Sequence, residues 1–137
     1  MWWIYALLSA FFAALTAIFA KVGIKGVDTD LATAIRTVVI LILAWGIAFF
    51  RGGVTTMNTL TRHNLIFLIL SGIATGLSWI FYFKALQMGK VSLVAPVDKA
   101  SVAIAIILSV IFLGETLTLK MALGALMIVA GTIILIL

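Results

Sequence analysis

The sequence contains no cysteine, one histidine and one proline. Without cysteine the chain can form no disulfide, no thiol nucleophile and no cysteine-ligated metal site. The histidine, His63, stands beside Arg62 in a polar segment, and no His/Asp/Ser set, glycine-rich phosphate loop or spaced group of metal ligands occurs elsewhere. These absences predict that the protein is not an enzyme and that it holds no metal or cofactor.

Charge is also scarce, because only 9% of the residues are Asp, Glu, Lys or Arg, whereas 66% are hydrophobic. A soluble domain carries roughly 25% charged residues, and a small soluble fold has too little interior to hide this much apolar surface. The composition therefore predicts an integral membrane protein whose main partner is the lipid bilayer. The basic residues that give the net charge of +5 are scattered between apolar runs, which is typical of residues that flank membrane spans and not of a nucleic-acid-binding patch.

A helix needs about 20 apolar residues to cross a bilayer, and five stretches of this sequence approach that length. The sequence predicts an all-α membrane protein, a five-transmembrane-helix bundle within a single domain, 1–137. The predicted spans are 2–20, 31–50, 65–86, 91–113 and 121–137. The segments between them are short and rich in Gly, Thr, Asn or charge, as expected of loops at a membrane surface.

One face of the third span is expected to point inward. Hydroxyl groups recur along it at helical spacing, at Ser71, Thr75, Ser78 and Tyr82. Beside them lie a GxxxG pair, Gly72 and Gly76, and then Trp79. Small and hydroxyl-bearing residues prefer a helix interface or a wet cavity to lipid. Simple helix packing for the glycines, and an interfacial aromatic belt for Trp79 and Tyr82, remain open as alternatives.

Four charged residues are expected to share one depth in the membrane. At 1.5 Å per residue, Arg36 lies about 7 Å into its span and Asp98 about 10 Å into its own, from the same membrane face. Lys84 lies near the end of the third span on that side, and Lys99 follows Asp98. Adjacent residues project about 100° apart on a helix, so we do not expect Asp98 and Lys99 to face each other. Arg36 and Lys84 are the candidate partners of Asp98.

Charged residues inside a span are costly, which makes a functional site the default hypothesis. We therefore predict a layer that binds substrate or protons, made of Asp98, Lys99, Arg36, Lys84, Trp79, Tyr82 and Ser78. In the alternative, the lysines reach the headgroups and Asp98 is a structural ion-pair partner. Pro96 is a helix-breaking residue in a helix interior, but it would be harmless if its helix began near Val94.

Three segments carry a family resemblance: LSWIFYFKALQMGKVSLVAPVDKASVAI, IFLGETLT and GALMIVAGTIILI. They resemble the EamA-type domain of the drug/metabolite transporter superfamily, in particular its small five-span bacterial and archaeal members. The matching positions are Trp79, Tyr82, Lys84, Ala85, Leu86, Gly89, Pro96, Asp98, Lys99, Gly114, Glu115, Gly124 and Gly131.

The resemblance implies secondary transport or export of a small polar, amino-acid-like metabolite across the inner or plasma membrane of a bacterium or archaeon. Larger relatives have ten spans in two inverted five-span halves around a central cavity, and this chain resembles one half. A homodimer is therefore expected, and an antiparallel one would need little charge bias between the two faces. The loops carry three basic residues on one face and four on the other; counting Arg36 and Lys99 makes it three against six, which favours one orientation.

Two alternatives to this function remain open at the level of sequence. The first is a structural or assembly subunit of a membrane complex that transports nothing itself. The second is a small-multidrug-type efflux protein. The absence of Asp and Glu from the first span, 2–20, argues against the second, because that type relies on an acidic residue there.

Overall fold

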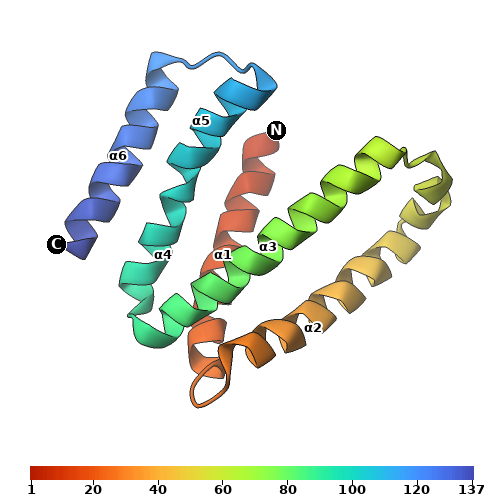
Figure 1. The fold of residues 1–137 in the computed structure, drawn as a ribbon, viewed down its shortest axis with the longest axis horizontal. Helices are drawn as coiled ribbons and strands as arrows, with labels where there is room; N and C mark the ends of the chain where they lie inside the picture. The colour runs from red at the N-terminus through yellow and green to blue at the C-terminus, as the bar shows by residue number, and fades with distance from the viewer. The chain divides into compact units, whose positions relative to one another are not determined.

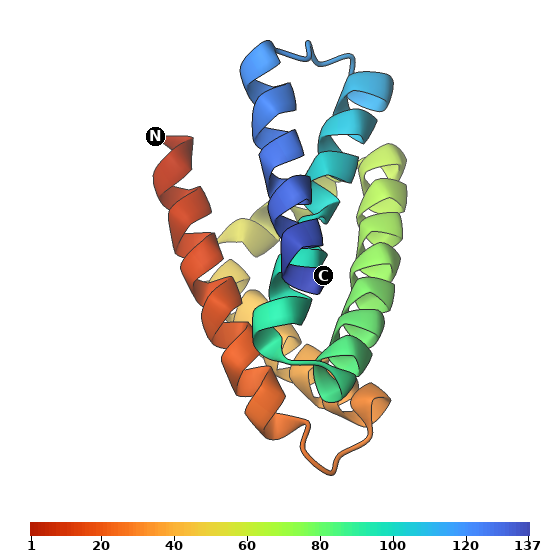
Figure 2. The ribbon, with the colours of Figure 1, turned by 90° about the vertical axis from the view of Figure 1, so that its left-hand side faces the viewer.

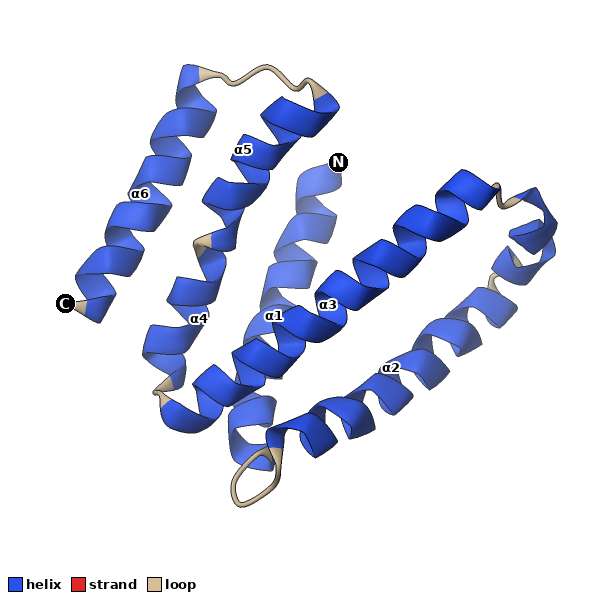
Figure 3. Cartoon of the chain, viewed as in Figure 1, coloured by secondary structure: helices blue, strands red, loops and turns tan.

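The computed structural model describes residues 1–137, all of them in helices, turns or loops (Figure 3). Contacts divide the chain into two units, one of residues 1–18 with 88–137 and the other of residues 19–87, and each is described by itself. The elements are α1 (Trp2–Gly23), α2 (Thr29–Phe50), η1 (Gly53–Thr59), α3 (Arg62–Met88), α4 (Val91–Lys99), α5 (Ser101–Leu113) and α6 (Leu119–Ile136) (Figure 1).

Five helices are long and apolar enough to cross a membrane, with α4 and α5 together forming one span. This confirms the predicted all-α membrane class. The helices run further than the predicted apolar runs, because polar residues at their ends continue the helix. Thus α3 begins at Arg62 and ends at Met88. The segment 51–63 was expected to be a loop, and that was wrong, since it contains the 3₁₀ helix η1.

Polar caps and glycines set the ends of several helices. Asp28 caps α2, because its carboxylate accepts hydrogen bonds from the backbone amides of Asp30 and Leu31, both at 3.0 Å. Thr118 caps α6 in the same way through the amide of Met121. The C-terminal end of α5 is set by Gly114, whose φ of 68° lies in the left-handed region that glycine adopts without strain.

In the unit of residues 1–18 and 88–137, α6 runs back alongside α4 and α5 (Figures 1 and 2). This span is broken, because α4 ends at Lys99 and α5 begins at Ser101. Pro96 lies in the interior of α4, so the suggestion that the helix begins near Val94 was wrong. A proline there removes one helical hydrogen bond and clashes with the preceding turn.

The break leaves one backbone carbonyl without its helical donor. The amide of Ala100 bonds to the carbonyl of Val97 at 3.0 Å and not to that of Pro96. Instead, the hydroxyl of Thr132 on α6 is shared between the carbonyl of Pro96, at 3.2 Å, and that of Ile128 in its own helix, at 2.8 Å. Thr132 is buried. Because an unpaired carbonyl is costly in lipid, this bond ties α6 to the broken span.

In the unit of residues 19–87, packing concentrates where the end of α1, the start of α2 and the end of α3 meet. Ala20, Ile24, Phe83 and Leu86 are buried there. The Lys21 ammonium donates to the carbonyl of Leu86 in the last turn of α3. The side-chain amide of Gln87 donates to the carbonyl of Val27 at 3.0 Å. Side chains thus satisfy carbonyls that helix ends and turns leave open.

Most large apolar side chains are exposed on the chain surface, as expected where lipid takes the place of water. The GxxxG pair of α3 makes no close packing within the chain. A Cβ added at Gly72 or Gly76 would meet nothing within 4 Å. Within the unit of residues 19–87, the glycine face therefore contributes no packing, and the buried groups of that unit described above do.

The hydrogen bond from Thr132 to Pro96 gives a testable prediction. We expect Thr132→Val to lower the free energy of unfolding by about 0.5–1.5 kcal/mol, the range of hydrogen bonds between membrane helices. The matched control is Thr75→Val, because the Thr75 hydroxyl bonds only to the carbonyl of Ser71 in its own helix. Reversible unfolding in mixed micelles measures both variants. Equal losses in the two would show that the contact with Pro96 contributes nothing.

Candidate functional site

The site is built around Arg36, a charged residue inside the span of α2. Arg36 is the eighth residue of α2, which places it about 10 Å along the helix from its start. Its guanidinium carbon lies 4.9 Å from the ring centroid of Trp79 and 4.6 Å from that of Phe83. Both distances are within the range of cation–π attraction. These contacts join α2 to α3 in the unit of residues 19–87.

The two rings come together because of their spacing on α3. Trp79 and Phe83 are four residues apart, so they lie one above the other on one helix face. Phe83 is fully buried, and this fixes the ring on which the guanidinium rests. Tyr82 packs beside Phe83 with ring centroids 6.1 Å apart. We call Arg36, Trp79, Tyr82 and Phe83 the arginine–aromatic cluster.

Within its unit, the guanidinium of Arg36 makes no hydrogen bond and no ion pair, and its neighbours are the aromatic rings. Lys84 follows Phe83 on α3, but it is exposed and takes no part in the cluster. Asp98, the expected partner of these two residues, belongs to the other unit. A pairing of Asp98 with Arg36 or Lys84 therefore stays a prediction.

Asp98 does have a partner, and it is the neighbour that the helical projection excluded. The Lys99 ammonium lies 3.3 Å from a carboxylate oxygen of Asp98, so the expectation that the two do not face each other was wrong. Lys99 is the last residue of α4, and its long flexible side chain folds back along the helix end. The two side chains are 57% and 36% exposed on the surface of their unit, for Lys99 and Asp98 respectively.

Of the predicted hydroxyl stripe of α3, Tyr82 alone belongs to the cluster, and the other three residues do not face the interior of the unit. Ser71, Thr75 and Ser78 are exposed, and Thr75 bonds to the carbonyl of Ser71 in its own helix at 2.8 Å. The packed face lies beside it and carries Trp79, Phe83 and Leu86. Phe83 was missed as a site residue. The only signal for it was its position between Trp79 and Leu86 at helical spacing.

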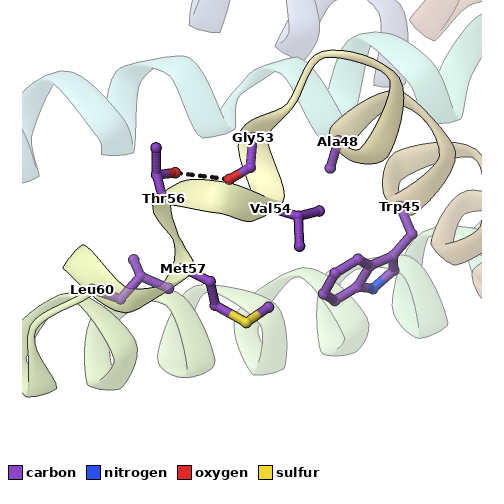
Figure 4. A pocket seen from close by; sticks show the side chains of 7 residues that line it. All are labelled: Trp45, Ala48, Gly53, Val54, Thr56, Met57 and Leu60. Atoms are coloured by element: carbon purple, nitrogen blue, oxygen red, sulfur yellow. Dashed lines mark hydrogen bonds between the residues drawn. The ribbon is translucent and has the colours of Figure 1, made fainter.

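A second feature is an apolar pocket of about 280 Å³ between the end of α2 and η1 (Figure 4). It is lined by Trp45, Ala48, Gly53, Val54, Thr56, Met57 and Leu60. The one hydroxyl in this set, that of Thr56, is committed to the carbonyl of Gly53 at 2.7 Å. Because no charged side chain lines the pocket, it does not suit a polar solute. The arginine–aromatic cluster is the better candidate.

Comparison with known proteins bears on these features as a set. A family model described as the EamA-like transporter family matches residues 1–137, the whole of the sequence. The chain belongs to the EamA-like transporter family. This confirms the resemblance carried by the segments around Trp79, Asp98 and Gly124, and membership points to a transporter rather than an enzyme.

Two curated relatives are similar to this EamA-like chain. A protein of Sinorhizobium sp named "Uncharacterized transporter in cobO 3'region" is 48% identical over 134 residues, which cover 98% of this chain and 95% of the relative. An uncharacterized protein of Methanocaldococcus jannaschii is 37% identical over 71 residues, about half of each chain (52%). No solved structure matches the chain. The match with the first relative thus covers nearly the whole of both chains.

The contact between Trp79 and Arg36 predicts where Trp79 lies in the membrane. In variants that keep a single tryptophan, the others being replaced by Phe, we expect brominated lipids to quench Trp79 less than Trp45. Trp45 is 43% exposed on the surface of its unit, whereas the guanidinium of Arg36 covers part of the Trp79 ring. Steady-state fluorescence in reconstituted bilayers makes the measurement. Stronger quenching of Trp79 would place it in an interfacial belt and remove it from the site.

Proposed function

We propose that this EamA-like protein is a secondary transporter of a small polar, amino-acid-like metabolite in the cell membrane of a bacterium or archaeon, and that it works as a homodimer. The observation that carries the proposal is the presence of charged side chains within two of the spans, Arg36 in α2 and Asp98 with Lys99 in α4. Charges at such positions cost free energy on insertion and mark solute or ion pathways in membrane proteins.

The positions of these charges along their own helices support a common layer. Arg36 and Asp98 each lie seven residues after the start of their helix, about 10 Å along it. In a chain that crosses the membrane at each span, α2 and α4 start on the same face. The charges of the two helices are therefore expected at one depth, where a solute that has left the water would meet both.

The break in the fourth span supports the same function. Asp98 and Lys99 lie between Pro96 and the interruption at Ala100, so the charges sit at the point where the helix is discontinuous. Discontinuous helices are a recurrent feature of transporter binding sites. Because the carbonyl of Pro96 is already bonded by Thr132, the charged side chains at the interruption are the groups that would contact solute or ions. This role for Asp98 and Lys99 is part of the proposal.

Replacement of Asp98 tests the proposal. We expect Asp98→Asn to lower solute flux by at least about tenfold, because Asn neither carries the charge nor takes up a proton, and one charge-assisted hydrogen bond is worth that much. Insertion and the elution profile should not change. Proteoliposome uptake from a mixture of labelled metabolites makes the measurement, with Lys120→Gln in the exposed start of α6 as the control. Full transport by Asp98→Asn would contradict the assigned role.

The arrangement of the homodimer is open to labelling, because the chain has no native cysteine. Single cysteines are placed at Asn58 in η1 and at Met88, the exposed last residue of α3, which lie at opposite ends of α3. An antiparallel dimer predicts partial reaction of both sites with an impermeant maleimide in intact cells. Complete reaction at one site with none at the other would refute the antiparallel arrangement.

A further inference from the structure

We propose that the arginine–aromatic cluster is the site that binds a carboxylate group of the solute, with the Arg36 guanidinium as the recognising group. This inference rests on the proposed transport function, since it names the chemical class of the solute at one of the proposed site residues. It starts from an observation within the unit of residues 19–87, where Arg36 carries hydrogen-bond donors inside a span and its contacts are with aromatic rings.

Within the unit of residues 19–87, no hydrogen bond uses the donors of Arg36. A guanidinium presents five N–H groups in a planar fork and cannot be deprotonated in a protein. Its contacts here are with the faces of Trp79 and Phe83, which attract the positive charge but offer no lone pair in the plane of the fork. Charge attraction to rings and hydrogen bonding to an oxyanion use different parts of the group. The rings therefore hold Arg36 in place without occupying its N–H groups.

Within residues 19–87, no carboxylate pairs with Arg36. Residues 19–87 include six Lys or Arg and two acidic residues, Asp28 and Asp30, and no acidic residue follows until Asp98. Asp28 is engaged as the cap of α2, and Asp30 lies in the first turn of that helix. Lys21 and Lys25 lie at the same end of the unit as these caps. The two lysines match the two aspartates in number, so Arg36 and Lys84 are the excess positive charges here, and an anion would complete the charge balance at Arg36.

The shape of the cluster favours an organic carboxylate. The fork of a guanidinium matches the two oxygens of a carboxylate in a bidentate pair, which is both strong and directional. The rings of Trp79 and Tyr82, each only partly covered, offer apolar surface beside the fork for the rest of the solute. An oxyanion could also come from the phosphate of a lipid headgroup. However, Arg36 lies about 10 Å along α2, deeper than the headgroup layer of roughly 5–7 Å on each side.

The first test measures binding to the full-length protein, with Trp79 as the single tryptophan. The probes are two carboxylates and their amides, propionate with propionamide and cyclohexanecarboxylate with cyclohexanecarboxamide, which do not absorb where tryptophan does. We expect saturable changes in Trp79 emission and a raised melting temperature with each carboxylate, and neither with the amide. The melting temperature is also measured on the parent protein, which carries no substitution, so this part of the comparison stands even where a substitution impairs folding. Equal responses to acid and amide would overturn the inference.

Variants then assign the recognition to Arg36. We expect Arg36→Gln to lower carboxylate affinity by about 10- to 100-fold, the loss of one charge-assisted hydrogen bond. Arg36→Lys keeps the positive charge but not the planar fork of N–H groups. Its affinity for the carboxylates should lie between that of the parent protein and that of Arg36→Gln. The control is Arg51→Gln, the same change at the exposed end of the same helix, which should bind as the parent does. Unchanged affinity in a folded Arg36→Gln protein would overturn the inference.

Two further experiments complete the test. One distinguishes a solute carboxylate from a lipid phosphate as the bound anion, and the other distinguishes failure of the carboxylate site from failure of the transport function. In nanodiscs, a response of Trp79 to phosphatidylglycerol with none to the carboxylates would assign the site to lipid phosphate and overturn the inference. Flux is measured separately in proteoliposomes. Arg36-dependent carboxylate binding without any flux would support the site while the transport function fails. Flux that depends on Asp98 and is unchanged in Arg36→Gln would leave the transport function standing and overturn the carboxylate site.

Discussion

The rest of the structure depends on one constraint, which is that a backbone polar group inside lipid must find its partner within the protein. Continuous helices meet it for most of the chain. Where helices end or break, side chains supply the donors, as Lys21 does for Leu86, Gln87 for Val27 and Thr132 for Pro96. Each of these bonds joins segments more than 30 residues apart. The contacts that hold the helices together are thus found where the helical pattern is interrupted.

The charged groups of the spans are stabilised in two different ways. Asp98 is neutralised by the next residue, so its ion pair lies within one helix. Arg36 is held by aromatic rings that attract its charge without using its hydrogen-bond donors. A group with a partner of its own can exchange that partner for a proton or a solute. A group that lacks an acceptor is suited to bind one, which is the division of roles that the proposals assign to Asp98 and Arg36.

The sequence predicts the fold class well and the side-chain arrangement poorly, for physical reasons. Long apolar runs leave no alternative to membrane helices, so α1 and α6 follow from composition alone. Arg36 stands out as a charge in such a run. Phe83 does not, because in a membrane protein an apolar residue among apolar residues carries no signal for which face is buried. The pairing of Asp98 with Lys99 depends on the flexibility of a lysine side chain at a helix end, which helical projection ignores.

The adjacency of Asp98 and Lys99 has a consequence for the membrane potential. A single charge that crosses 100 mV changes its energy by about 2.3 kcal/mol. While the pair is intact, α4 carries both signs at one depth, so its displacement moves no net charge through the field. Replacement of Asp98 by Asn would leave the charge of Lys99 unbalanced in this segment, and the voltage would then act on it. The ion pair thereby makes this helix insensitive to the membrane potential as long as the pair is intact.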